Sequence, residues 1–217
     1  ITGPSTKPFV LYGAGGSGKS ALLSKTALMS IKEWLQPAVP LLMCRYCGTT
    51  PNSTALGPLL KSICQQISYT FMLPFEDIPD DTVPVTAFLK ELLKLASKDK
   101  PLLIFLDSVD ELTGSTDSNK MSWLPLKLPA HCKIVVSCTY KEGNPALMQD
   151  LQFLRQMFED DDQFLEVTAL GTELAWRVMK LWMENAGRTL TNFQWRVVAN
   201  ALNSCSLPIF SKLVFQE

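Results

Sequence analysis

The sequence contains little that would direct the chain to nucleic acid or to a membrane. Its 217 residues carry 20 basic against 21 acidic side chains, which leaves a formal net charge of −1. Such a balance produces no overall field toward an anionic partner, and no local basic patch makes up for it. The longest apolar runs, such as 102–106, have the length of a strand and not the roughly 20 residues of a membrane helix. We therefore expect neither a nucleic-acid partner nor a membrane span.

Disulfide and zinc chemistry also have little support, since there is one histidine and there are six cysteines. The cysteines stand mostly among apolar residues, which favours reduced, buried thiols in a cytoplasmic protein over a disulfide framework. Cys44 and Cys47 form a C-x-x-C pair, but a zinc site needs a second pair of ligands. His131 beside Cys132 does not supply a convincing one.

What is present is the composition of a packed domain, with 47% hydrophobic and 19% charged residues. The chain opens "ITGPSTKPF", with neither an initiator methionine nor the pattern of a secretory signal, and it ends inside a helical pattern. We interpret it as a piece of a longer protein.

Short apolar segments that alternate with helical stretches predict the fold. Strands are expected at 9–12, 40–47, 102–107, 133–138 and, most weakly, 163–167. Apolar residues recur at helical spacing over 23–35, 56–67 and 85–95. This alternation is typical of an α/β protein of three layers, in which helices cover both faces of a mostly parallel, five-stranded sheet.

The pattern changes after residue 167, where strands cease and helices follow. Thr172 is the expected N-cap of a helix that ends at Gly187, and Thr191 with Gln194 forms a capping box for the next. We divide the chain into an α/β domain over 1–167 and part of a small helical domain over 168–217. The acidic run 159–162 between them is expected to be a solvated loop.

The segment "YGAGGSGKSAL", residues 12–22, satisfies two nucleotide motifs. Gly13, Gly15 and Gly18 match the dinucleotide fingerprint, which also needs an acid at the end of the second strand to bind a ribose. The nearest acid, Glu33, falls inside a predicted helix. A dinucleotide site would therefore lack the acid that binds the ribose.

The other motif, G-x-x-x-x-G-K-S, follows a strand and opens a helix, as a phosphate loop must. Its backbone N–H groups converge on phosphates at a helix N-terminus, Lys19 reaches the terminal phosphates, and the Ser20 hydroxyl binds Mg²⁺. The predicted nucleotide-binding residues of this loop are Gly13, Ala14, Gly15, Gly16, Ser17, Gly18, Lys19, Ser20 and Ala21.

A second motif, "PLLIFLDSVDEL" over 101–112, supports the same conclusion. Its apolar run ends in Asp107, at the edge of the sheet where ligands of open α/β folds bind, so Asp107 is the predicted second Mg²⁺ ligand. Asp110 and Glu111 follow on the loop, where one of them could orient or deprotonate an attacking water. By itself the segment could also be an acidic loop after a core strand.

Together "GAGGSGKS" and "LLIFLDSVDEL" resemble the NACHT class of STAND P-loop nucleoside triphosphatases, in which acids follow the second motif as D-x-x-D-E. The stretch "CRYCGTTPNSTALGPLLKSICQQI" resembles NACHT and WD-repeat proteins. The resemblance implies ATP or ADP with Mg²⁺, a helical lid, and a winged helix and WD-repeat propeller beyond this piece. The lid's nucleotide-touching proline corresponds to Pro208 in "SLPIF", which also fits the first turn of a helix.

One departure from the family pattern concerns the fourth strand. The family commonly has T-S-R there, with the arginine sensing the terminal phosphate, whereas "SCT" places Thr139 at that position. Threonine carries no guanidinium charge, and Lys141 or Arg45 are substitutes that do not follow from spacing. Loss of such a cation lowers hydrolysis by several orders of magnitude, unless a neighbouring subunit supplies an arginine.

Three functions remain open from the sequence. The first is an ATP-binding, slowly hydrolysing switch that controls self-association or partner binding of a larger signalling scaffold. The second is a constitutive triphosphatase or small-molecule kinase. The third is an interaction module that holds its nucleotide without hydrolysis.

Overall fold

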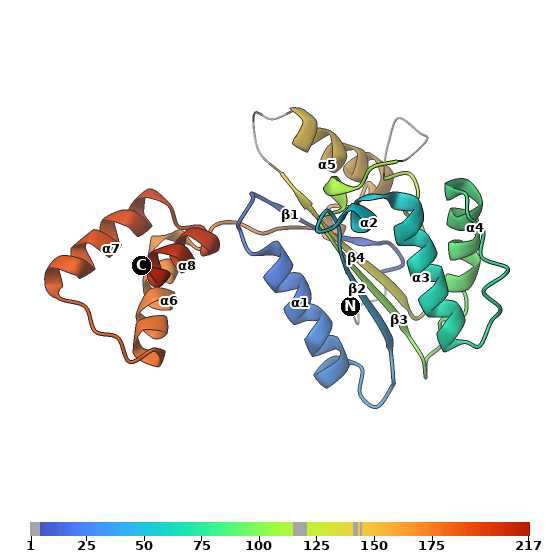
Figure 1. Ribbon diagram of the computed structural model, residues 1–217, viewed down its shortest axis with the longest axis horizontal. Helices are drawn as coiled ribbons and strands as arrows, with labels where there is room; N and C mark the ends of the chain where they lie inside the picture. Colours follow the sequence, from blue (N-terminus) through green and yellow to red (C-terminus); the bar gives the residue numbers. More distant parts are fainter. Residues whose placement is uncertain (1–4, 115–120, 141–142, 144) are drawn as a thin grey trace.

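Five parallel strands form one sheet in the order β2-β3-β4-β1-β5 (Figure 1). The computed structural model describes residues 5–114, 121–140, 143 and 145–217. The strands are β1 (Phe9–Gly13), β2 (Leu41–Tyr46), β3 (Leu102–Asp107), β4 (Cys132–Thr139) and β5 (Phe164–Glu166). All five strands predicted from the sequence are present, and each end lies within one residue of its predicted position. Their carboxyl ends share one edge, so Gly13, Asp107 and Thr139 all reach that edge.

Helices cover both faces of the sheet and make the expected three layers. One face carries α1 (Lys19–Met29), which continues as a π-helical turn over Ser30–Trp34. The other carries α3 (Leu56–Thr70), α4 (Thr82–Leu93) and α5 (Pro145–Phe158), while the short α2 (Pro51–Thr54) precedes α3. The apolar periodicity did not identify α5.

Packing of the two faces follows from the period of two along each strand. Ile104 and Leu106 join the larger core beneath α3 and α4, while Leu103 and Phe105 join the smaller core beneath α1. Every residue of β3 is buried, as expected for a strand covered on both sides. The central strand therefore delivers Asp107 from a fixed position.

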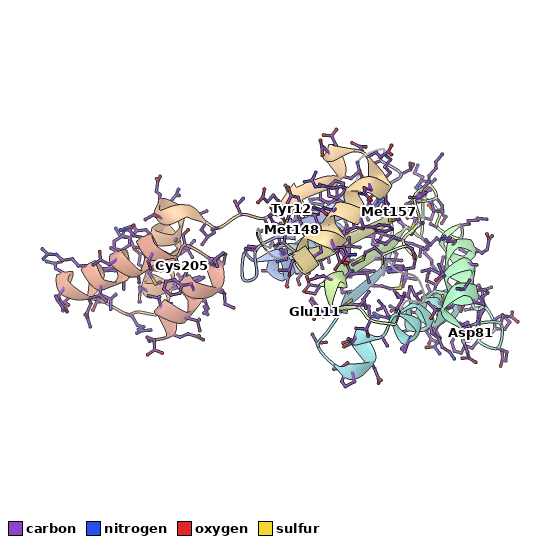
Figure 2. The ribbon with its side chains drawn as sticks, turned by 90° about the horizontal axis from the view of Figure 1, so that it is seen from above. Tyr12, Asp81, Glu111, Met148, Met157 and Cys205 are labelled. Carbon is purple, nitrogen blue, oxygen red and sulfur yellow. The ribbon has the colours of Figure 1, made fainter. Side chains whose placement is uncertain are left out.

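The C-terminal part consists of three helices with a core of their own, set to one side of the sheet (Figures 1 and 2). They are α6 (Gly171–Asn185), α7 (Asn192–Ser204) and α8 (Pro208–Gln216). The capping box of Thr191 and Gln194 is confirmed. The expected cap at Thr172 is wrong, because α6 begins at Gly171 with Leu170 as N-cap and without a side-chain cap. The division at residue 167 stays a prediction.

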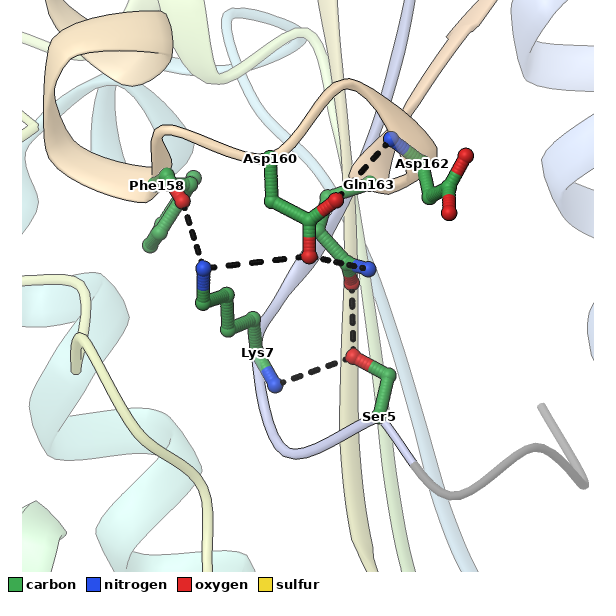
Figure 3. Close-up of polar contacts among 6 residues, drawn as sticks. All are labelled: Ser5, Lys7, Phe158, Asp160, Asp162 and Gln163. Carbon is green, nitrogen blue, oxygen red and sulfur yellow. Dashed lines mark hydrogen bonds and ion pairs between the residues drawn. The ribbon is translucent and has the colours of Figure 1, made fainter.

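The N-terminal segment is tied to the chain just before β5 (Figure 3). Lys7 Nζ donates to the Phe158 carbonyl oxygen at 2.7 Å and lies 3.8 Å from a carboxylate oxygen of Asp160, and Ser5 Oγ donates to the Gln163 side chain at 2.8 Å. The acidic run is thus partly paired, and a short 3₁₀ turn begins at Asp161.

All six cysteines are free thiols, and four of them are buried. Burial raises the pKa of Cys47, Cys64 and Cys132 to about 12. Across the residues described, no helix combines the length and apolar character needed to cross a membrane.

Candidate nucleotide-binding site

The glycine loop turns sharply at the end of β1 and leads directly into α1. A Cβ at Gly13 would lie 2.3 Å from the Val167 carbonyl oxygen, so no side chain fits there. Gly18 is the N-cap of α1 with φ +98°, a left-handed conformation that favours glycine. Because α1 has neither a side-chain cap nor an acidic residue in its first turn, its leading N–H groups suit an external anion.

Lys19 is bent back over the loop. Its ammonium is largely buried and donates hydrogen bonds to the carbonyl oxygens of Gly13 and Ala14, each at 2.9 Å. Burial lowers the pKa of Lys19, and among nearby charges Asp110 opposes this shift most. Ser17 Oγ is also buried and has no hydrogen-bond partner. A positive charge held by neutral carbonyls beside an unsatisfied hydroxyl fits a phosphate group.

Asp107 lies at the carboxyl end of β3 and is 5% exposed. The Ser137 hydroxyl donates to its Oδ1 at 2.5 Å and accepts a hydrogen bond from the Ser108 backbone N–H at 2.9 Å. The carboxylate is therefore fixed in orientation. Together with the exposed hydroxyl of Ser20 in the first turn of α1, Asp107 has the oxygen chemistry that Mg²⁺ prefers.

The two acids after β3 lie in different surroundings on a 3₁₀ turn, Val109–Glu111. Asp110 is buried, and this desolvation raises its pKa against hydrogen bonds from its own backbone N–H and from the backbone and hydroxyl of Thr139. Glu111, labelled in Figure 2, is exposed, and its side chain lies against Gly48 in the loop after β2. The charge of Asp110 therefore acts on the Lys19 ammonium, whereas the Glu111 side chain faces solvent.

The position expected for a phosphate-sensing arginine holds Thr139, which pairs in register with Gly13. Arg45 does not replace that cation, because its guanidinium donates to Ser62 at 3.2 Å and Gln66 at 2.7 Å on α3. Lys141 lies outside the described residues.

The last helix of the C-terminal part, α8, meets the glycine loop directly. The Ile209 backbone N–H donates to the Gly16 carbonyl oxygen at 3.3 Å, and a Cβ at Gly16 would lie 2.3 Å from Ile209 Cγ2. Pro208, the first residue of α8, comes within 3.6 Å of a Cβ built at Gly18. Pro208 is therefore next to the loop, and its contact with a nucleotide stays a prediction.

The remaining loop residues differ in surroundings. Ala14, Ser20 and Ala21 are exposed, and a Cβ at Gly15 would meet nothing within 4 Å. The structure thus brings Lys19, Asp107 and Asp110 to one edge of the sheet, with open space over part of the loop.

Two residues of this region were missed in the sequence. Ser137 is a fully buried polar residue that follows the apolar run Ile134–Val136 of β4, and that pattern was a usable signal. Ile209 follows the candidate proline, but no local pattern indicates that its side chain reaches Gly16.

Comparison with known proteins agrees with this geometry. The family model described as "NACHT domain" matches residues 7–186. The human "NACHT and WD repeat domain-containing protein 2" is 30% identical over 215 residues, covering 97% of this chain and 12% of that protein. The human "NACHT domain- and WD repeat-containing protein 1" is 29% identical over 214 residues, covering 97% of this chain and 13% of that protein.

Solved structures support the fold. The Aeropyrum pernix ORC2 protein, solved as ADPNP-ADP complexes, aligns with a TM-score of 0.60 at 12% identity over 97% of this chain and 55% of its own. The Aeropyrum pernix ORC1 protein in complex with DNA aligns with the same TM-score at 11% identity, over 98% of this chain and 54% of its own. At such identity the likeness concerns the three-layer P-loop fold alone. The chain spans about one eighth of the length of the relatives named above.

Proposed function

The chain belongs to the NACHT domain family, and we propose that it is an ATP-binding, slowly hydrolysing switch within a larger protein. Nucleotide binding by a P-loop domain is what the family membership supports. Dependence on Mg²⁺, slow turnover and control of assembly or partner binding are the further parts of the proposal. Free thiols remain reduced in the cytoplasm, and we assign the domain to that compartment.

The observation that carries the proposal is the position of Lys19. Its ammonium lies nearly buried over the glycine loop, near Asp110 and Asp107, at the uncapped N-terminus of α1. The oxygens of a phosphate chain would replace the loop carbonyls as hydrogen-bond partners of the ammonium. They would also accept hydrogen bonds from the first N–H groups of α1.

Ser20 and Asp107 would hold the metal ion. When bound, Mg²⁺ would neutralise charge on the phosphate oxygens. Ser137 keeps the Asp107 carboxylate in one orientation for this purpose. Asp110 and Glu111 are the candidates for orienting or deprotonating the attacking water.

Slow hydrolysis follows from the charges around the site. The sensor position carries a threonine, and Arg45 is bound to α3. Transition-state stabilisation by a guanidinium is worth several orders of magnitude in rate, so its absence at this position favours holding over turnover. An arginine from a neighbouring subunit would restore that stabilisation upon assembly.

The lid provides the link from nucleotide to conformation. Because Ile209 and Pro208 of α8 pack directly on Gly16 and Gly18, a ligand that occupies the loop interacts differently with docked and undocked positions of α8. Such differential interaction is what a conformational switch requires. WD-repeat segments, which the names of the relatives mention, would supply protein-partner surfaces elsewhere in the protein.

Binding of ATP and ADP to Lys19→Ala protein tests the first part of the proposal. Loss of the ammonium should weaken binding at least about tenfold, because a charged hydrogen bond is worth about 1.5–3 kcal/mol. The control is Lys25→Ala, an exposed lysine on the same helix, which should bind as wild type does. Equal affinity in the two variants would refute phosphate binding by this loop.

A second measurement concerns the switch. The assembly state of the complete protein is compared in ATP, ADP and a non-hydrolysable analogue, together with steady turnover. We expect assembly to differ between ATP and ADP while turnover stays slow. Fast turnover would indicate a constitutive triphosphatase, and assembly indifferent to all three nucleotides would leave an interaction module with a structural nucleotide.

A further inference from the structure

Two side chains flank the Asp107 carboxylate along the carboxyl edge of the sheet. Tyr46, at the end of β2, pairs in register with Asp107. Two residues earlier on the same strands, Cys44 and Phe105 pack beneath α1, and because side chains alternate along a strand, Tyr46 and Asp107 point toward this face as well. On the other side of Asp107, the Ser137 hydroxyl donates to the carboxylate at 2.5 Å. Tyr46 therefore occupies the β2 side of the candidate metal ligand.

The Tyr46 hydroxyl is joined to α1 by hydrogen bonds that run in one direction. Its oxygen lies 2.8 Å from Ser24 Oγ in the second turn of α1. Ser24 Oγ donates its single proton to the Ser20 carbonyl oxygen at 2.7 Å, so Tyr46 is the donor in the bond to Ser24. The hydrogen bonds thus lead from the end of β2 through Ser24 to the backbone of Ser20.

This link joins the two elements that carry the candidate Mg²⁺ ligands. Ser20 is the second residue of α1, whereas Asp107 is the last residue of β3, so one ion can be held by both only if the helix keeps its place along the sheet. Leu23 and Ala27 pack α1 on the sheet through apolar contacts, which are not directional. The hydrogen bond from Tyr46 is directional, and it starts from the residue beside Asp107.

We propose that Tyr46 is a positioning residue for the metal site, because its hydroxyl fixes the first turns of α1 against β3 so that Ser20 and Asp107 can bind one Mg²⁺ ion together. This inference rests on the proposed function and on its Mg²⁺ dependence in particular. Tyr46 acts through Ser24 and the helix backbone, and not as a ligand. Its side chain is 42% exposed, so water can replace the hydroxyl at Ser24 if it is removed. The expected loss is one of positioning and not of folding.

The test measures the affinity of the complete protein for ATP in EDTA and at saturating Mg²⁺. The ratio of the two affinities reports the coupling between metal and nucleotide. Tyr46→Phe keeps the ring and removes the hydroxyl, and it should lower this ratio about two- to tenfold, the range that one net hydrogen bond is worth. Affinity in EDTA should stay within about twofold of wild type, because the phosphate loop and Lys19 are unchanged.

A second variant, Ser24→Ala, breaks the same link from the side of the helix. It should lower the ratio by a similar factor, and adding it to Tyr46→Phe should cause no further fall, because both remove one interaction. The matched control is Tyr69→Phe, at a tyrosine of α3 that is 78% exposed, and it should keep the wild-type ratio. Thermal unfolding of each variant reports structural damage.

Three outcomes would overturn the inference: a wild-type ratio in Tyr46→Phe, an equal loss of affinity with and without Mg²⁺, or a double variant whose ratio falls by the product of the two single effects. Wild-type protein that binds ATP equally well in EDTA and in Mg²⁺ would also overturn the inference, together with the proposed Mg²⁺ dependence, but would leave nucleotide binding intact. Wild-type protein that binds no nucleotide would refute the proposed function itself.

Discussion

Substitution of Gly16 by alanine tests the contact between α8 and the glycine loop. Three glycines of this loop differ in what a Cβ would meet. At Gly16 it would lie 2.3 Å from Ile209 Cγ2, and φ is +78°. At Gly18 φ is also positive, +98°, but the nearest atom, Pro208 Cγ, is at an ordinary 3.6 Å. At Gly15 φ is not positive and nothing lies within 4 Å.

Two effects determine how much Gly16→Ala should weaken the contact with α8. A left-handed conformation costs an alanine about 1–2 kcal/mol, and this strain applies to Gly16 and Gly18 alike. At Gly16 the Cβ and Ile209 Cγ2 must also separate by about 1.2–1.7 Å to reach an ordinary carbon–carbon distance. That movement breaks the hydrogen bond from the Ile209 N–H to the Gly16 carbonyl oxygen, worth about 1 kcal/mol, and removes part of the apolar contact. We expect the docked position of α8 to be weakened about tenfold in Gly16→Ala alone.

Hydrogen exchange of the amides at the start of α8, in the absence of nucleotide, measures how firmly α8 is docked. Exchange over 207–212 should accelerate in Gly16→Ala and remain as in wild type in Gly15→Ala. Gly18→Ala should lose global stability without faster exchange in α8. Adding Ile209→Ala to Gly16→Ala removes the atom that clashes, so exchange over 207–212 should be no faster in the double variant than in Ile209→Ala alone. If Gly16→Ala and Gly18→Ala gave the same exchange at α8, the contact between Ile209 and the loop would be refuted.

Two further predictions concern stability. Leu23→Ala, at a fully buried position of α1, should lower the free energy of unfolding by about 2–5 kcal/mol. Leu22→Ala, at a neighbouring position that is 38% exposed, should lower it by less than half as much. Urea titration compares the two variants, and equal losses would contradict the packing of α1 on the sheet. The buried thiols Cys47, Cys64 and Cys132 have folded-state pKa values raised to about 12, so their contribution is complete below pH 9 and is lost as the pH rises from 9 toward 12. The free energy of unfolding, measured with urea at pH 8 and pH 10, should fall by up to about 1.4 kcal/mol per thiol between the two. Replacing Cys64 by alanine should reduce this dependence on pH, and an unchanged dependence would contradict the burial of this thiol.

The phosphate loop and the strands could be predicted from the sequence because their signals are local. "GAGGSGKS" specifies a turn and a helix start through contiguous residue types, and "LLIFLD" specifies a buried strand that ends in a carboxylate. Helix caps were less secure. Thr191 and Gln194 were identified correctly because a capping box lies within four residues, whereas the start of α6 is at Gly171 and not after Thr172.

Tertiary structure alone decided which acids are held, and by what. Ser137 reaches Asp107 and Ile209 reaches Gly16, although no periodicity relates the members of either pair. The strand order sets β4 between β3 and β1, and this adjacency brings the Ser137 hydroxyl of β4 to the carboxylate at the end of β3. By itself the sequence determined a phosphate-binding loop and a nearby acid, because each is encoded in a short run of chain. Their orientation depends on parallel strands sharing one carboxyl edge and on a C-terminal helix returning to the loop, and those contacts exist only in the folded molecule.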